Sequence, residues 1–170
     1  MMLIALLKKS RKGKVNHPVH HITGKAEVKI MEKKLFFIKL VLWLGIIMDF
    51  VSCLPLLVPS LGAKMYGIPI VPSGEDYLYV SRMSAVFMFG WTLLLLWAVL
   101  KPVERRGVIL LTVFPVLIGL AVSPLRAVMS GMIKLPYIAP LWIWQGILVG
   151  LFLLAYIFAR QLEKDTYGKT

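Results

Sequence analysis

The sequence is poor in the residues on which most redox and catalytic chemistry depends. It contains one cysteine, Cys53, which excludes both an intramolecular disulfide and a redox-active dithiol. All three histidines precede the first apolar stretch, so the apolar stretches hold no pair of imidazoles for a haem. A phosphate-binding loop, a metal-ligand cluster and an activated nucleophile are missing from the sequence as well. We therefore predict no cofactor and no catalytic residue.

Acidic residues and long polar segments are also scarce. Asp and Glu number 8, and charged residues make up 16% of the 170 positions, whereas hydrophobic residues make up 59%. Ordinary soluble domains contain about 45–50% apolar residues, so this composition, with a mean hydropathy of +0.80, predicts an all-α polytopic membrane protein. The net charge of +12 comes from Lys and Arg beside apolar stretches, which favours the membrane surface over nucleic acid as their partner.

Four apolar stretches are each long enough to cross a hydrocarbon core of roughly 30 Å at about 1.5 Å per residue. We predict a four-transmembrane-helix bundle with spans at about residues 35–59, 77–100, 108–125 and 137–159. Pro55 and Pro59 are expected to kink or end the first span. Residues 60–76 are rich in Gly and Pro, which favours a structured loop over a further helix.

The transmembrane domain, residues 35–159, lies between a basic tail at residues 1–34 and a short tail at residues 160–170. The two tails and the loop after the second span carry most of the Lys and Arg residues. We therefore predict that both termini are cytosolic, with the protein in the cytoplasmic (plasma) membrane. The basic tail could associate with the anionic inner leaflet; alternatively, Met31 is the natural start and the residues before it are an extension.

The basic tail contains three clustered histidines, His17, His20 and His21. Clustered imidazoles can bind a transition metal, but a structural site needs four fixed ligands, and no carboxylate or cysteine stands beside these three. A solvated polar tail is the simpler interpretation, so we predict no metal site.

Asp49 is the one carboxylate inside the first span, and an ionisable group at that depth needs a polar partner or water. It lies fourteen residues beyond Leu35, which leaves it about 9 Å below the outer boundary of the membrane. Arg82 lies five residues beyond Tyr77, roughly 8 Å below the same boundary. Because the two depths match, the sequence predicts that Asp49 and Arg82 meet.

Other polar side chains are expected to join this pair in the outer half of the bundle. Arg126 follows the third span, Gln145 is the only strongly polar side chain deep in the fourth, and Glu75 and Asp76 lie at the rim. A pocket with surplus positive charge would suit an anionic or amphipathic ligand, because guanidinium binds carboxylate or phosphate through a planar fork. The same buried charges could instead form a structural clamp between helices.

Small residues spaced four apart occur in the third and fourth spans. The two pairs are Gly119 with Ser123, and Gly146 with Gly150. Such pairs let helices approach closely, either within one chain or between chains.

The layout combines a Gly/Pro-rich connection after the first span, a second helix that opens with Arg82 and continues through Gly90, and Arg126 followed by Gly131. In these features the chain resembles the DoxX-like group of small four-helix membrane proteins over roughly residues 35–159. Some members of that group are associated with quinone-linked oxidoreductases. Because the group is functionally mixed, the resemblance implies a fold more than an activity.

Three functions of different classes remain open. Small size and the lack of a catalytic constellation favour a non-enzymatic accessory or scaffold subunit, whose partners are the lipid bilayer and other membrane proteins. A second possibility is a binding protein or transporter for a small anionic or amphipathic, lipid- or quinone-like ligand in the outer-half pocket. The third is an enzyme acting on a lipid or isoprenoid, in which a desolvated Asp49 would serve as acid or base.

Overall fold

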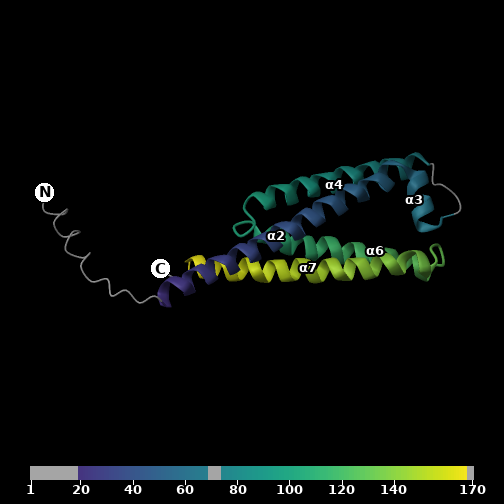
Figure 1. Cartoon of the computed structure of the whole chain (residues 1–170). Helices are drawn as coiled ribbons and strands as arrows, with labels where there is room; N and C mark the ends of the chain where they lie inside the picture. Colours follow the sequence, from purple (N-terminus) through teal and green to yellow (C-terminus); the bar gives the residue numbers. More distant parts are fainter. Residues whose placement is uncertain (1–18, 69–73, 168–170) are drawn as a thin grey trace, which may run out of the picture. The chain divides into compact units, whose positions relative to one another are not determined.

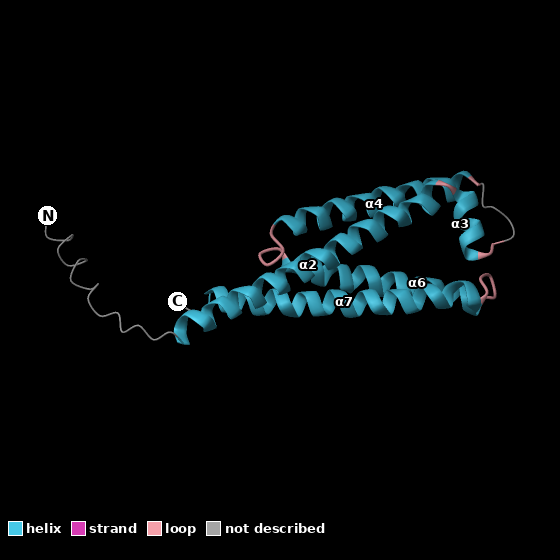
Figure 2. Cartoon of the chain, in the orientation of Figure 1, coloured by secondary structure: helices cyan, strands magenta, loops and turns pink. Residues whose placement is uncertain are grey.

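The computed structural model describes residues 19–68 and 74–167, which are helical except for short connections (Figure 2). The helical elements of these residues are α2 (Val19–Leu57), α3 (Pro59–Tyr66), α4 (Glu75–Leu100), α5 (Arg106–Leu111), the π-helical segment η1 (Thr112–Leu117), α6 (Ile118–Met129) and α7 (Leu135–Tyr167). The chain divides into two compact units, Met1–Lys33 and Lys34–Thr170. In the first unit the described residues are the helical start of α2. The second unit contains the rest of α2 and all the other described helices, and the description below concerns this unit.

Four helical segments of the described chain are long and apolar enough to cross a membrane. They are Glu27–Leu57, Glu75–Leu100, Arg106–Met129 and Leu135–Asp165. The predicted all-α fold with four transmembrane helices is therefore confirmed. We call the end that carries the α4–α5 connection the inner end, and the end that carries α3 and the α6–α7 connection the outer end, after the predicted orientation.

The connection after the first span differs from its prediction, because residues 59–66 form a helix and not a loop. Pro59 lies at the start of α3, where its fixed backbone angle suits a helix and its missing N–H is not needed. Gly67 ends the helix in the left-handed conformation, with φ 64°, which glycine adopts without steric cost. Pro59 and Gly67 therefore mark the two ends of a short helix.

The third span is interrupted near its middle, where α5 passes into η1 and then α6. Phe114 has extended backbone angles of φ −119° and ψ 113°, as expected for a residue that precedes a proline. Thr112 donates a side-chain hydrogen bond of 2.8 Å to the carbonyl oxygen of Val108. The interruption separates a well-buried inner part of the span from α6, none of whose residues is buried.

The hydrophobic core lies mainly in the inner half, where all four spans contribute fully buried side chains. These are Ile38, Val41, Leu42, Leu95, Ile109, Val113 and Phe152. At the outer limit of this core, α2 approaches α7 closely at Gly45, where a Cβ atom would lie only 2.7 Å from Cζ of Phe152. A close crossing of this kind requires glycine.

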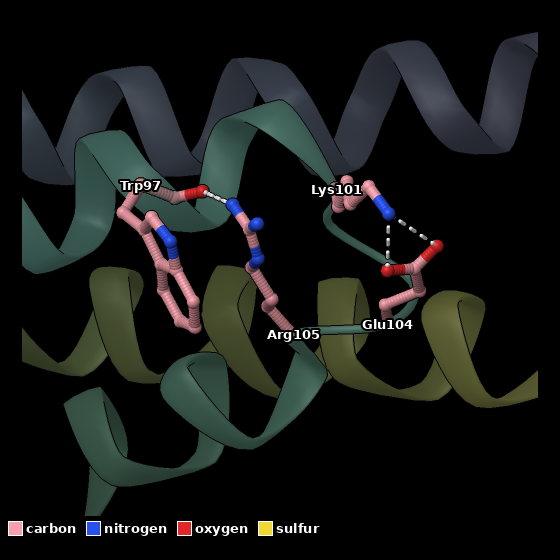
Figure 3. Close-up of polar contacts among 4 residues, drawn as sticks. All are labelled: Trp97, Lys101, Glu104 and Arg105. Atoms are coloured by element: carbon pink, nitrogen blue, oxygen red, sulfur yellow. Dashed lines mark hydrogen bonds and ion pairs between the residues drawn. The ribbon is translucent and has the colours of Figure 1, made fainter.

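Polar contacts hold the inner end together. Lys34 donates a hydrogen bond of 2.9 Å to Gln161, and Arg106 forms an ion pair with Glu163. In the α4–α5 connection, Arg105 donates to the backbone oxygen of Trp97 and stacks over its ring at 3.8 Å, beside the ion pair between Lys101 and Glu104 (Figure 3). The inner hairpin is therefore held by its own side chains.

The outer half is more open. The α2–α4 pair and the α6–α7 pair lie close together towards the inner end and diverge towards α3 (Figure 1). Within the α2–α4 pair, Ser81 donates a hydrogen bond of 2.5 Å to the backbone oxygen of Leu56. In the α6–α7 pair, Trp142 donates one of 2.9 Å to the backbone oxygen of Ala121. Each pair is thus tied internally, which leaves space between the two pairs.

Candidate ligand-binding site

A cleft of about 600 Å³ lies in the outer half of the bundle, with walls from α2, α4, η1 and α6. Its lining residues are Asp49, Leu56, Ser84, Phe87, Met88, Trp91, Val116, Gly119, Leu120 and Ser123. Most of these side chains are apolar, and Asp49 is the only charged group among the described residues of the lining. This volume falls within the range of roughly 300–1,000 Å³ that is typical of small-molecule sites.

Two polar atoms of the lining residues have no hydrogen-bond partner within the described structure. They are Oδ2 of Asp49 and Nε1 of Trp91, both buried. Leaving a buried donor or acceptor without a partner costs about 1–3 kcal/mol, so native proteins rarely do so without a functional reason. Two residues of the cleft wall therefore carry an unpaired acceptor and an unpaired donor.

A second chamber of about 260 Å³ adjoins the cleft towards the outer end, where α3 forms part of its wall. The two spaces share the lining residues Leu56, Met88, Leu120 and Ser123. Tyr66 of α3 lines this chamber, and burial, with a smaller contribution from Tyr77, raises the pKa of its phenol. The hydroxyl group therefore stays protonated at neutral pH and remains a hydrogen-bond donor.

Gln145 is the member of the predicted cluster, besides Asp49, that reaches this space. It lines the second chamber and is only 7% exposed, and its Oε1 atom has no hydrogen-bond partner among the described residues. Gln145 also lines a groove of about 330 Å³ between α6 and α7. Its side chain therefore separates the interior of the bundle from an outer face of the α6–α7 pair.

The expected match in depth between Asp49 and Arg82 is absent, and the register of the two helices explains why. Because Ser81 bonds to Leu56, the neighbouring Arg82 lies level with the end of α2. Asp49 is seven residues before Leu56, which places it about 10 Å farther towards the inner end. The depth estimate failed because it took the outer ends of the two spans as level, whereas α4 begins at Glu75, six residues or about 9 Å before the serine that bonds to the end of α2.

The remaining residues of the predicted cluster lie outside the cleft. Arg82, Arg126, Glu75 and Asp76 are exposed, and none of them is among the described residues that line either space. Within the described residues, ion pairs join Lys101 to Glu104 and Arg106 to Glu163, so Asp49 takes part in none. The structure brings Asp49 and Gln145 to two neighbouring spaces and leaves both arginines exposed.

Three polar residues of the lining were not identified from the sequence as site residues. Ser84 and Ser123 are short hydroxyl side chains that pattern analysis cannot distinguish from ordinary packing residues. Trp91 carries a usable signal, because tryptophan prefers the two membrane interfaces and Trp91 lies well inside its span. A tryptophan at mid-membrane depth points to a partner for its N–H group inside the protein.

The structure does not describe the side chains of the three histidines that were considered as metal ligands. His17 lies outside the described residues, and His20 and His21 lie in the first turn of α2 with side chains that are not described. Among the described residues, no three His, Cys, Asp or Glu side chains come together in a way that could hold a metal ion.

The fold and the cleft define a class, a four-span integral membrane protein with a cleft between helices in its outer half. Comparisons with protein-family models, with curated proteins and with solved structures return no match to this chain. The resemblance to the DoxX-like group stays a prediction.

Proposed function

We propose that this integral membrane protein binds a small amphipathic molecule, lipid- or quinone-like, in the cleft beside Asp49. The observation that carries the proposal is the pair of unpartnered polar atoms, Oδ2 of Asp49 and Nε1 of Trp91, on residues that line one largely apolar cleft. An amphipathic ligand would satisfy polar groups with its head and fill the apolar space with its chain.

The walls of the cleft support access from the bilayer. Phe87 is 72% exposed, and Gly119, Leu120 and Ser123 on the facing helix are exposed as well. A surface of this kind faces lipid in a membrane protein, so a lipid-soluble molecule would reach the cleft between α4 and α6 without crossing water.

The test fills the cleft with a leucine side chain. Gly119 lines the cleft, and a Cβ atom at this position would meet no atom within 4 Å, so Gly119→Leu should occupy the space without a clash. Gly90 is the matched control, since its Cβ atom would also meet nothing within 4 Å and it is not among the residues that line the cleft. Each protein would be placed in nanodiscs, and saturable binding of tritiated 1-dodecanol would be measured.

We expect saturable binding to the wild-type protein and to Gly90→Leu, and a loss of at least tenfold in affinity for Gly119→Leu. Equal binding by the two variants would place the ligand elsewhere and contradict the proposal. Thermal unfolding of both variants would establish that each is folded.

A second candidate function is an accessory subunit of a larger membrane complex, and the α6–α7 groove favours it. Gly146 lines this groove and Gly150 follows one turn later; a Cβ atom at either position would meet nothing within 4 Å. Gln145, buried with an unpartnered Oε1 atom, lines the same groove. A transmembrane helix of another protein could pack closely against these glycines and bond to the amide.

The mass of the particle after mild extraction would test this second function. We expect the wild-type protein to elute with a partner, above the protomer mass of 19.2 kDa plus detergent, and Gly146→Leu to elute as the lone protomer. A wild-type protein that elutes alone, or a Gly146→Leu variant that keeps its partner, would count against it. Gly90→Leu again serves as the control.

We also propose that both termini are cytosolic, in the cytoplasmic membrane, on the basis of the Lys and Arg distribution. A single cysteine at Glu104 or at Ser130, in a Cys53→Ser background, would test this orientation in intact cells. A membrane-impermeant thiol reagent should label Ser130→Cys and leave Glu104→Cys unlabelled. The opposite pattern would invert the topology.

A further inference from the structure

We infer that the head group held beside Asp49 is a protonated amine, so that the ligand is a cationic amphiphile and not an anionic one. This inference rests on the proposed function, because it concerns the same cleft. The sequence had favoured a ligand with a negative charge, because Arg82 and Arg126 were expected at the site; the structure favours a ligand with a positive charge.

The first argument concerns the missing counter-charge. Asp49 has no ion pair with any described residue, and none of the described residues that line the cleft or the second chamber is Lys, Arg or His. An ionised carboxylate surrounded by apolar groups is costly unless it is paired. A cationic head group would supply the charge that the protein itself does not provide.

The second argument concerns the other groups that line the cleft. Phe87 and Trp91 both line the cleft, and aromatic rings attract cations through their π faces. Ser84 donates its hydroxyl hydrogen to the backbone oxygen of Val80 at 2.8 Å, so its oxygen remains free to accept. A carboxyl group, two aromatic rings and a hydroxyl acceptor together suit an ammonium group.

The third argument concerns the two arginines that would recognise an anion. Arg82 lies about 10 Å farther towards the outer end than Asp49, and its side chain is exposed. Arg126 is exposed and lines neither space. An anionic head group in the cleft would therefore face Asp49 without a guanidinium to offset the repulsion.

The position of Asp49 also fits an amphiphile. The carboxyl belongs to a partly exposed residue, and a carboxyl group rotates easily about its terminal torsion, so either oxygen can turn towards the cleft. The apolar lining residues Leu56, Met88, Val116 and Leu120 would then surround the first part of the alkyl chain. The rest of the chain would extend between α4 and α6 towards lipid.

The experiment compares three ligands that share one chain, namely dodecylamine, 1-dodecanol and dodecanoate, each tritiated. Binding would be measured at pH 7 to the full-length protein in nanodiscs of phosphatidylcholine, which carries no net charge. The measured quantity is the ratio of Kd for Asp49→Asn to Kd for the wild-type protein. Taking this ratio for each ligand cancels the difference in how the three ligands partition into the bilayer.

We expect the substitution to weaken dodecylamine binding by about tenfold or more, since a hydrogen bond to a charged partner is roughly twice as strong as a neutral one. The affinity for 1-dodecanol should change by less than threefold, and the affinity for dodecanoate should rise. Asp49→Glu keeps the charge and should keep the preference for the amine, which separates loss of charge from loss of fold.

Equal ratios for the amine and the alcohol would overturn the inference, because the carboxyl would then recognise any donor and not a cation. A ratio for dodecanoate above that for dodecylamine would overturn it as well. If none of the three ligands binds in a manner sensitive to Gly119→Leu, the proposed function fails, and this outcome is distinct from the other two.

Discussion

The inner and outer halves of this bundle are built from the same four spans and yet differ in packing. In the inner half, α2, α4, α5 and α7 contribute fully buried side chains around Phe152, and polar contacts such as Arg106–Glu163 join the helix ends. In the outer half, α6 has no buried residue and the two helix pairs enclose a cleft of about 600 Å³. The close packing of the inner half stabilises the bundle. The outer half can therefore keep a cavity, although a cavity lowers the stability of the fold.

The two halves also differ in whether their polar groups are paired. The inner polar groups are paired at the membrane surface, whereas Asp49, Trp91 and Gln145 lie deeper and each keep an unpartnered atom within the described structure. Natural cores pair nearly all buried polar atoms. Of the four unpartnered side-chain atoms among the described residues, three belong to residues that line the cleft or the second chamber, and the fourth is Nε1 of Trp144, so most of the exceptions gather at one site. Four substitutions test whether the two halves differ in this way, and they are given in order of decreasing expected effect.

Phe152→Ala should have the largest effect on stability. Phe152 is 1% exposed in the inner core, and truncating a buried phenylalanine costs about 3–5 kcal/mol in the free energy of unfolding. Titration with sodium dodecyl sulfate in mixed micelles would measure the loss. Phe87→Ala, at a residue 72% exposed beside the cleft, is the matched control and should change stability by about 0.5 kcal/mol or less. Similar losses for both would mean that the two halves are packed alike.

Gly45→Ala should disturb the point where the two halves meet. The added Cβ atom would lie 2.7 Å from Cζ of Phe152, and Phe152 is enclosed by the core and cannot move away. Overpacking of this kind costs about 1–3 kcal/mol. Gly90→Ala meets no neighbouring atom within 4 Å and should be neutral or slightly stabilising. The same titration applies, and a neutral Gly45→Ala would show that α2 is free to shift.

Asp49→Leu should raise the stability of the protein by about 1–3 kcal/mol, because it removes an unpaired carboxyl from an apolar environment. A structural clamp would behave in the opposite way, since breaking a buried ion pair costs about 3–5 kcal/mol. Arg82→Gln, at an exposed residue with no ion pair among those described, is expected to stay within about 0.5 kcal/mol. If both variants lowered the stability, the result would support a structural clamp between Asp49 and Arg82.

Arg105→Ala should have the smallest effect, about 0.5–1 kcal/mol, through loss of its stacking on Trp97 (Figure 3). Arg105→Lys keeps the charge but not the planar group, and it should recover only part of the loss. Thermal unfolding in micelles would resolve the order of the three proteins. Ligand binding in the outer half should be unchanged in both variants, and a change there would mean that the halves are coupled.

Much of the fold could be predicted from the sequence because the bilayer imposes a simple rule. Each span must be a helix of sufficient length and apolar character, and four such stretches can be recognised without knowledge of their packing. The helix at Pro59–Tyr66 was missed because its Gly and Pro residues also suit a loop. Whether such residues end a helix or prevent one depends on their positions; α3 has Pro59 and Gly67 at its two ends and tolerates Gly62 inside.

The candidate site was predicted in part. Asp49 could be singled out because a carboxylate inside a span is rare, and Gln145 because no other strongly polar side chain lies within the predicted span at residues 137–159. Trp91 could have been singled out by its depth in the span, whereas Ser84 and the position of Arg82 could not, since they depend on how α4 is shifted along α2. That shift follows from contacts such as Ser81 with Leu56, and residue counts from estimated membrane boundaries do not contain this information.

The sequence by itself therefore determined the class of protein, the number of spans and the presence of an ionisable group within the membrane, because each follows from local hydrophobicity and length. The tertiary structure decided which groups share a space with that carboxylate. Helix register and the divergence of the two pairs bring Asp49, Trp91 and Gln145 to the interior and leave both arginines on the surface. Both are properties of packing between distant segments, which no single apolar stretch specifies.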